Sequence, residues 1–168
     1  MPKSHGFTLI ELLVTISIIA ILFSIGLMAY SAVLKQGRDS KRQSDIRSIQ
    51  SALEQYYSDQ GFYPLYGVST CSNGQLAFNA SSPCKFKDPS GTKTYMNSVP
   101  TDPLSSNPQY LYVPFNYSTG AGCDNVSSNK ICNGYCLYAN LENASGISNP
   151  PDCSSPLPNG YNFAVTTP

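Results

Sequence analysis

The sequence predicts an α+β fold: one long N-terminal helix, membrane-spanning in its first half, packs on a small antiparallel sheet with disulfide-stapled loops. Three observations support this expectation. The run Leu12–Leu34 carries no charge and, at about 1.5 Å per helical residue, is long enough to cross a hydrocarbon core of roughly 30 Å. Apolar residues continue at helical spacing as far as Tyr57. Beyond Gly61 tyrosine, proline and glycine become frequent, and all 6 cysteines lie within Cys71–Cys153.

The helix is expected from about residue 8 to residue 59. No proline occurs between Lys35 and Gln60, and apolar residues recur there at spacings of three and four, which predicts one apolar stripe. Gly61 stands where a C-terminal cap belongs, and Pro64 follows shortly. The stripe consists of Ile46, Ile49, Leu53, Tyr56 and Tyr57.

Three tyrosine-rich runs bounded by turn residues predict strands at residues 109–114, 134–141 and 161–166. Their order in the chain favours an antiparallel meander whose inner face covers the apolar stripe of the helix. Residues 62–100 are expected to form a long and mostly irregular connection. A connection of this length is usually functional or stapled, and its two cysteines indicate stapling.

An even number of cysteines in a small, loop-rich domain indicates a disulfide framework formed in an oxidising compartment. The bridge Cys71–Cys84 closes its loop most locally, and for the rest we favour Cys123–Cys132 with Cys136–Cys153. A thiolate metal site at the Cys132-x-x-x-Cys136 spacing is disfavoured, because His5, the one histidine, lies in the short segment before the apolar run. The cysteines expected in disulfides are Cys71, Cys84, Cys123, Cys132, Cys136 and Cys153.

Glu11 is the most informative residue of the apolar segment. A charge inside a membrane-spanning helix costs roughly 2.5 kcal/mol or more and therefore needs a partner. Proteolysis after the small residue Gly6 would create a new α-amino group on Phe7, four residues before Glu11. An ammonium group of this kind would pair with the carboxylate of a neighbouring copy, which indicates self-assembly inside a membrane.

The stretch Gly6–Val14, GFTLIELLV, resembles the prepilin signature of type IV pilins and type II secretion pseudopilins. The resemblance implies a type IV pilin-like fold, cleavage between Gly6 and Phe7 by a prepilin peptidase, methylation of the Phe7 amine, and assembly through Phe7 and Glu11. It also implies identical or related subunits and an inner-membrane assembly platform as partners. The leader Met1–Gly6 precedes the apolar segment, whereas an ordinary secretory signal is cut after it.

Two further stretches resemble the major pseudopilin branch of that family. Tyr57–Pro64 resembles its helix-ending Y-x-D-x-G-x-Y-P, and Val99–Tyr110 resembles a degraded P-x-D-P-W-G-N-P-Y segment without the tryptophan. That branch commonly binds calcium through closely spaced acidic residues. Here Asp102, Asp124 and Asp152 are isolated, so calcium is not expected.

The expected organisation is a leader at residues 1–6, a transmembrane and filament-core helix at 7–34, an amphipathic continuation at 35–60 and an extracytoplasmic head at 61–168. The positive-inside rule disagrees, because the basic residues cluster after the span and would place the head in the cytoplasm. The cysteines and the implied peptidase favour a head outside the cytoplasm. The protein is therefore expected as a single-pass inner-membrane protein before assembly, in contact with lipid, and afterwards in a periplasmic or cell-surface filament.

The basic stretch Lys35–Arg47 is expected to form a solvated or headgroup-level helix face. From Ser48 onward the chain is mildly acidic, whereas a nucleic-acid-binding head would more often be basic, so no nucleic-acid partner is expected. Sequons in a chain rich in asparagine and serine are attributed to chance. They begin at Asn79, Asn116, Asn125 and Asn143.

Together these features predict a structural subunit, or prepilin, of a type IV pilus or a type II secretion pseudopilus, with no cofactor and no metal. One alternative is a singly anchored extracytoplasmic adhesion or ligand-binding module whose tyrosine-rich loops bind carbohydrate. Another is a membrane-tethered enzyme, which is disfavoured because the sequence offers no Ser-His-Asp set, no Cys-His set and no Gly-rich phosphate loop. Glu11 favours the subunit, since a simple anchor has no use for it. Pilus, pseudopilus and competence filament stay open, as do major and minor subunit.

Overall fold

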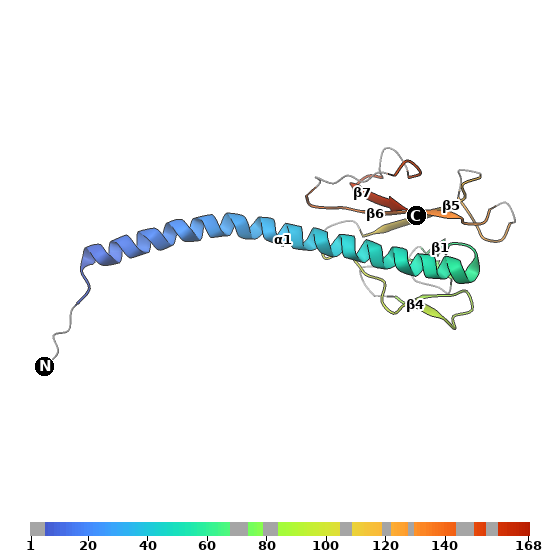
Figure 1. Ribbon diagram of the computed structural model, residues 1–168, viewed down its shortest axis with the longest axis horizontal. Helices are drawn as coiled ribbons and strands as arrows, with labels where there is room; N and C mark the ends of the chain where they lie inside the picture. The colour runs from blue at the N-terminus through green and yellow to red at the C-terminus, as the bar shows by residue number, and fades with distance from the viewer. Residues whose placement is uncertain are drawn as a thin grey trace. The chain divides into compact units, whose positions relative to one another are not determined.

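The computed structural model describes residues 6–67, 74–78, 84–104, 109–118, 122–127, 130–143, 150–153 and 158–168 (Figure 1). The leader residues 1–5 and Cys71, and with it the predicted Cys71–Cys84 bridge, lie outside these ranges. The chain divides after Gly37 into two compact units.

Helix α1, Leu9–Gln60, has 52 residues and confirms the helix predicted for residues 8–59. Its C-terminal end follows from Gly61, which has a φ of 77° and donates its N–H to the Tyr57 carbonyl at 2.8 Å. A glycine in this left-handed conformation is a common way to end a helix. By length and composition, α1 contains a segment that is able to cross a membrane, and no part of that segment is buried.

The second unit holds a three-stranded antiparallel sheet of strands β5 (Leu111–Phe115), β6 (Gly134–Ala139) and β7 (Phe163–Thr166), in the order β5-β6-β7. The predicted meander is therefore confirmed. The central strand β6 is buried along its whole length.

The strands β6 and β7 are shorter than predicted because a side chain takes over the pairing at one end. Asn162 donates its amide nitrogen to the Leu141 carbonyl at 2.7 Å and accepts the Leu141 N–H at 2.7 Å. Each of these bonds replaces a backbone ladder bond, so residues 140–141 and 161–162 stay beside each other without belonging to the strands.

The connection at residues 62–100 is more regular than expected. It contains β1 (Leu65–Tyr66) parallel to β2 (Gln75–Leu76), and β3 (Phe86–Lys87) antiparallel to β4 (Thr94–Met96). Strands of two or three residues are too short to show an alternating pattern in the sequence.

The core of the second unit forms around the C-terminal part of α1. Four members of the predicted stripe, Ile46, Ile49, Leu53 and Tyr56, are at most 1% exposed. They pack with residues of β5 and β6 on one side and with Phe86 of β3 on the other, as Figure 1 shows for the three-stranded sheet and β4. The prediction that Tyr57 belongs to the stripe is wrong, since 38% of this residue is exposed.

Candidate functional site

The predicted cleavage site lies directly before α1. Gly6 and Phe7 are exposed and non-helical, and 85% of Phe7 is accessible to solvent. A Cβ atom on Gly6 would meet no other atom within 4 Å. The peptide bond between Gly6 and Phe7 is therefore accessible to a peptidase in the single chain.

Glu11 takes part in a reciprocal capping interaction with Thr8, which precedes the first helical residue. The Glu11 N–H donates to the Thr8 hydroxyl at 3.3 Å, while the Glu11 carboxylate accepts from the Thr8 N–H at 3.3 Å and from the Thr8 hydroxyl at 3.1 Å. This is a capping box, which satisfies two of the free N–H groups at a helix start. The pattern T-x-x-E of a capping box is present at Thr8–Glu11. It was missed in the sequence because only a partner for Glu11 on a neighbouring copy was considered.

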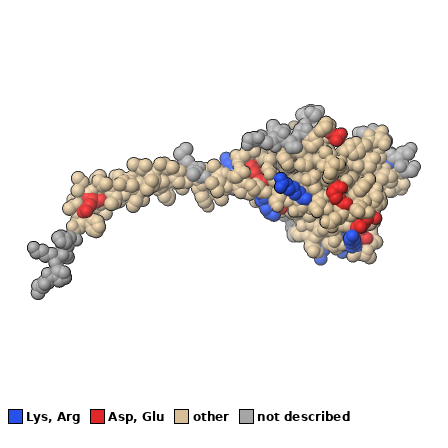
Figure 2. Space-filling view, viewed as in Figure 1, with Lys and Arg blue, Asp and Glu red and all other residues tan. Residues whose placement is uncertain are grey.

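The apolar residues of the first unit are exposed on all sides of the helix. Every described large apolar side chain from Leu9 to Leu34 is at least 43% exposed. In Figure 2 the first unit is mostly tan with one red group near its start, whereas most of the charged atoms lie on the second unit. Exposed apolar surface of this extent marks a membrane or protein interaction site. A helix that is apolar all round needs lipid or other helices around it.

One member of the basic stretch does not face solvent as predicted. Arg42 is completely buried. Its guanidinium binds the Asp102 carboxylate through two bonds of 2.7 and 3.0 Å, from Nε and Nη2. The Nη1 atom donates to Asp39 at 2.7 Å and to Glu142 at 3.0 Å. Burial of a charge is tolerable here because each side of the guanidinium is paired. The prediction holds for Lys35, Lys41 and Arg47, which are exposed.

Arg38 extends this ion-pair cluster. It holds Glu142 with two bonds of 2.6 Å, and this pairing, strengthened by Arg42, lowers the pKa of Glu142 to about 2. Asp39 in turn accepts the N–H groups of Glu142 at 2.9 Å and Asn143 at 2.8 Å. The cluster therefore ties two successive turns of α1 to the segment after β6 and, through Arg42, to Asp102.

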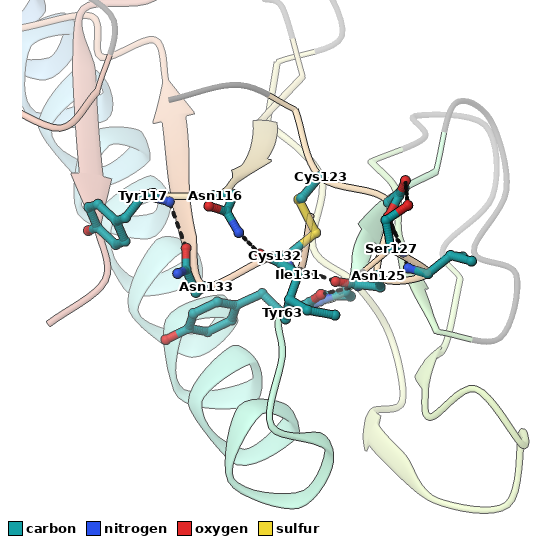
Figure 3. Close-up of a disulfide and its surroundings, with 12 residues drawn as sticks. Tyr63, Asn116, Tyr117, Cys123, Asn125, Ser127, Ile131, Cys132 and Asn133 are labelled. Carbon is teal, nitrogen blue, oxygen red and sulfur yellow. Dashed lines mark hydrogen bonds between the residues drawn. A yellow bond between two sulfur atoms is a disulfide. The ribbon is translucent and has the colours of Figure 1, made fainter. Parts of the chain in front are cut away.

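Among the residues that the structure describes, two disulfides staple the head, Cys123–Cys132 and Cys136–Cys153. They are the two pairings that we favoured from the sequence. Figure 3 shows the first of them beside Asn125, which has a φ of 55°. Asn125 donates to the Tyr63 carbonyl at 2.8 Å and accepts the Cys132 N–H at 2.7 Å. These bonds hold the disulfide loop on the segment that follows α1.

The structure also bears on glycosylation and calcium. In the folded head the amide nitrogens of Asn116 and Asn125 donate to the carbonyls of Ile131 and Tyr63, so modification of either side chain would have to break a hydrogen bond. Asp102 faces Arg42. Within the described residues no group of three His, Cys, Asp or Glu side chains is arranged to hold a metal.

Comparison with known proteins identifies relatives of this chain. A family profile described as "Prokaryotic N-terminal methylation motif" matches residues 1–27. The chain is 30% identical over 114 residues to the "Type II secretion system core protein G" of Aeromonas hydrophila, an alignment that covers 67% of this chain and 75% of that protein.

Fimbrial proteins are similar over a shorter part. The chain is 35% identical over 74 residues to a "Probable minor fimbrial protein" of Dichelobacter nodosus, with 44% of this chain and 42% of that protein covered. It is 36% identical over 74 residues to the "Fimbrial protein EcpC" of Eikenella corrodens, with 42% and 48% covered. The alignments thus span a little under half the length of these fimbrial relatives. No solved structure gives a significant match.

Proposed function

Because this chain belongs to the family of type IV pilins and type II secretion pseudopilins, we propose that it is a structural subunit of a filament built through its N-terminal helix. The observation that carries the proposal is the first unit: an apolar helix exposed on all sides, with Glu11 as its one acidic residue. Bundling of such helices removes apolar surface from water and lipid. The filament is a type IV pilus or a type II secretion pseudopilus.

The proposed assembly chemistry begins with cleavage between Gly6 and Phe7 by a prepilin peptidase and methylation of the new Phe7 amine. The Phe7 ammonium of one subunit then pairs with the Glu11 carboxylate of a neighbour. In the single chain that carboxylate is already held by the N–H and hydroxyl of Thr8. Pairing in the filament therefore competes with this local capping interaction. The replacement of Thr8 by the Phe7 ammonium of a neighbour is favoured because the ammonium carries a charge opposite to that of the Glu11 carboxylate.

Before assembly, the proposed location is the inner membrane, which the chain crosses once with its head outside the cytoplasm. An inner-membrane assembly platform then transfers the subunit into the filament. The disulfides Cys123–Cys132 and Cys136–Cys153 support this orientation, since such bridges persist in oxidising compartments. No enzymatic role is proposed, because the family is structural.

The function is tested with two substitutions at Glu11, in cells that contain the assembly machinery. Glu11→Val removes the charge and the cap, whereas Glu11→Gln removes the charge but keeps an acceptor for the capping box. Both should abolish filaments in sheared fractions while cleaved monomer stays in the membrane, because neither weakens insertion. Thr15→Val, which loses a bond within its own turn, is the control and should assemble.

Three results would contradict parts of the proposal. Normal filaments from Glu11→Gln but none from Glu11→Val would replace charge pairing by helix capping as the role of Glu11. Normal filaments from both variants would remove Glu11 from assembly. No filaments from the unmodified chain, with its machinery present, would favour a singly anchored binding module.

A further inference from the structure

Glu54 is a half-buried carboxylate of α1 whose hydrogen-bond partners in the described chain are neutral. Each of its oxygens accepts the Tyr63 hydroxyl at 3.2 Å, and one of them accepts the Tyr135 hydroxyl at 3.2 Å. Burial and the charge of Glu54 raise the pKa of Tyr63 and of Tyr135, so both hydroxyls stay protonated. Within the described part of the chain Glu54 makes no ion pair, unlike the buried carboxylates of Asp39 and Asp102.

The surface beside Glu54 suits a cation. Tyr57 follows three residues later on α1 and therefore lies on the same face of the helix. Its ring stacks on that of Tyr63, with the centroids 4.6 Å apart, and 38% of Tyr57 is exposed. A carboxylate is able to accept more hydrogen bonds than two hydroxyls donate, and a tyrosine ring attracts a guanidinium group stacked on it. Glu54 and Tyr57 together therefore form a site for an arginine side chain.

Arg47 is a cation of the same helix that lacks a counter-ion. It is exposed and belongs to none of the ion pairs among the described residues. Arg47 precedes Glu54 by seven residues, which is about two helical turns or roughly 10 Å, so both lie on one face of α1. Between two parallel copies that are shifted by two turns, Arg47 of one copy comes level with Glu54 of the other.

We propose that Arg47 of one subunit pairs with Glu54 of the next subunit and stacks on its Tyr57. This inference rests on the proposed filament function, because copies that cross one membrane in the same direction have parallel helices. Each copy offers a cation on one turn and its acceptor two turns later. The contact is therefore heterologous, and it repeats along an open filament instead of closing a dimer.

The test is the co-expression of two charge variants of the full chain in cells that contain the assembly machinery. Arg47→Glu presents two carboxylates on this face, and Glu54→Arg presents two guanidinium groups. Either variant alone should lower the yield of sheared filaments about 10-fold or more, because like charges then meet at every contact. Expressed together, the two variants should restore most of the yield, since alternating copies again bring opposite charges together.

Glu54→Gln gives a second measurement that does not require an arginine to fit beside Tyr63 and Tyr135. The amide still accepts from both hydroxyls, so the head should unfold in urea as the unmodified head does. Introduced into the Arg47→Glu chain, Glu54→Gln should recover part of the lost yield, because it removes the repulsion between the two carboxylates.

Lys130→Glu is the control, because it reverses an exposed charge elsewhere on the head and should assemble normally. The proposal is overturned if Arg47→Glu assembles as well as the unmodified chain or if Lys130→Glu loses as much yield. It is also overturned if the two folded charge variants fail to assemble together, or if Glu54→Gln recovers none of the yield lost by Arg47→Glu. Failure of the unmodified chain to form filaments would instead contradict the proposed function itself.

Discussion

Arg42 combines full burial with a complete set of partners. Its guanidinium lies among the carboxylates of Asp39, Asp102 and Glu142, and Arg38 adds a second positive charge at Glu142. Removing charges from water is so unfavourable that such clusters contribute little net stability, yet the loss of one member leaves the others unpaired. The cluster therefore acts mainly by fixing which segments lie against the helix.

The consequence can be measured with Arg42→Met, which keeps an unbranched side chain but removes the charge. We expect the free energy of unfolding to fall by about 3–5 kcal/mol, because Asp102 and Asp39 lose their counter-ion in a buried site. Urea titration of the full chain in detergent, followed by near-UV circular dichroism, gives this value. Arg47→Met is the control: this residue of the same helix is exposed, so the change should stay within about 0.5 kcal/mol. Equal effects of the two variants would mean that Arg42 is not paired as described.

Two chemically identical substitutions should have different effects on stability. Tyr112→Phe removes a hydroxyl that donates to the Pro64 carbonyl at 2.8 Å, so it should destabilise the head by about 1–2 kcal/mol. Tyr56→Phe removes a buried hydroxyl without a partner among the described residues, so stability should stay the same or rise. The same urea titration compares them. A loss of stability in Tyr56→Phe as large as that in Tyr112→Phe would show that the Tyr56 hydroxyl is satisfied in solution.

At the scale of elements, the sequence predicted the long helix and the three-stranded meander because both leave a pattern. The helix repeats its apolar residues every three or four positions and ends at a capping glycine, and each long strand is rich in tyrosine and aliphatics. Strands β1–β4 have two or three residues each and leave no period to detect. Burial of Arg42 was equally invisible, because its partners Asp102 and Glu142 are 60 and 100 residues away.

Strand β6 depends on a glycine at its first residue. A Cβ atom on Gly134 would lie 2.7 Å from ring atoms of both Phe115 and Tyr117, which pack edge to face. Gly134→Ala should therefore displace this ring pair and lower the free energy of unfolding by about 1–3 kcal/mol. The control is Gly122→Ala, whose new Cβ meets nothing within 4 Å. If both alanine variants unfold at the same urea concentration, the rings of Phe115 and Tyr117 move aside without any loss of stability.

At the scale of the whole molecule, the two units differ in how much of their structure and function can be predicted from the sequence alone. The methylation motif covers residues 1–27, and there the spacing of Gly6, Phe7 and Glu11 is readable from the sequence alone. The head is held by disulfides, by a buried ion-pair cluster and by side-chain amides that fix loops. The two described disulfides were expected from the sequence, whereas the pairing of Arg42 with Asp102 and Glu142 and the bond from Asn125 to Tyr63 join residues 60 to 100 positions apart and required the structure.

Processing is the prediction that involves the whole chain. Intact-mass measurement of protein from native membranes should give a chain that begins at Phe7 and carries one added methyl group, because the proposed cut lies before the apolar helix, which has to be retained for assembly. Gly6→Val should leave the full precursor in the membrane, since the branched side chain crowds the bond to be cut. Gly26→Ala, where a new Cβ also meets nothing within 4 Å, should be processed normally. A mature chain that still begins at Met1, or one without the apolar segment, would exclude the filament subunit proposed here, because neither form presents a Phe7 ammonium to the Glu11 of a neighbour.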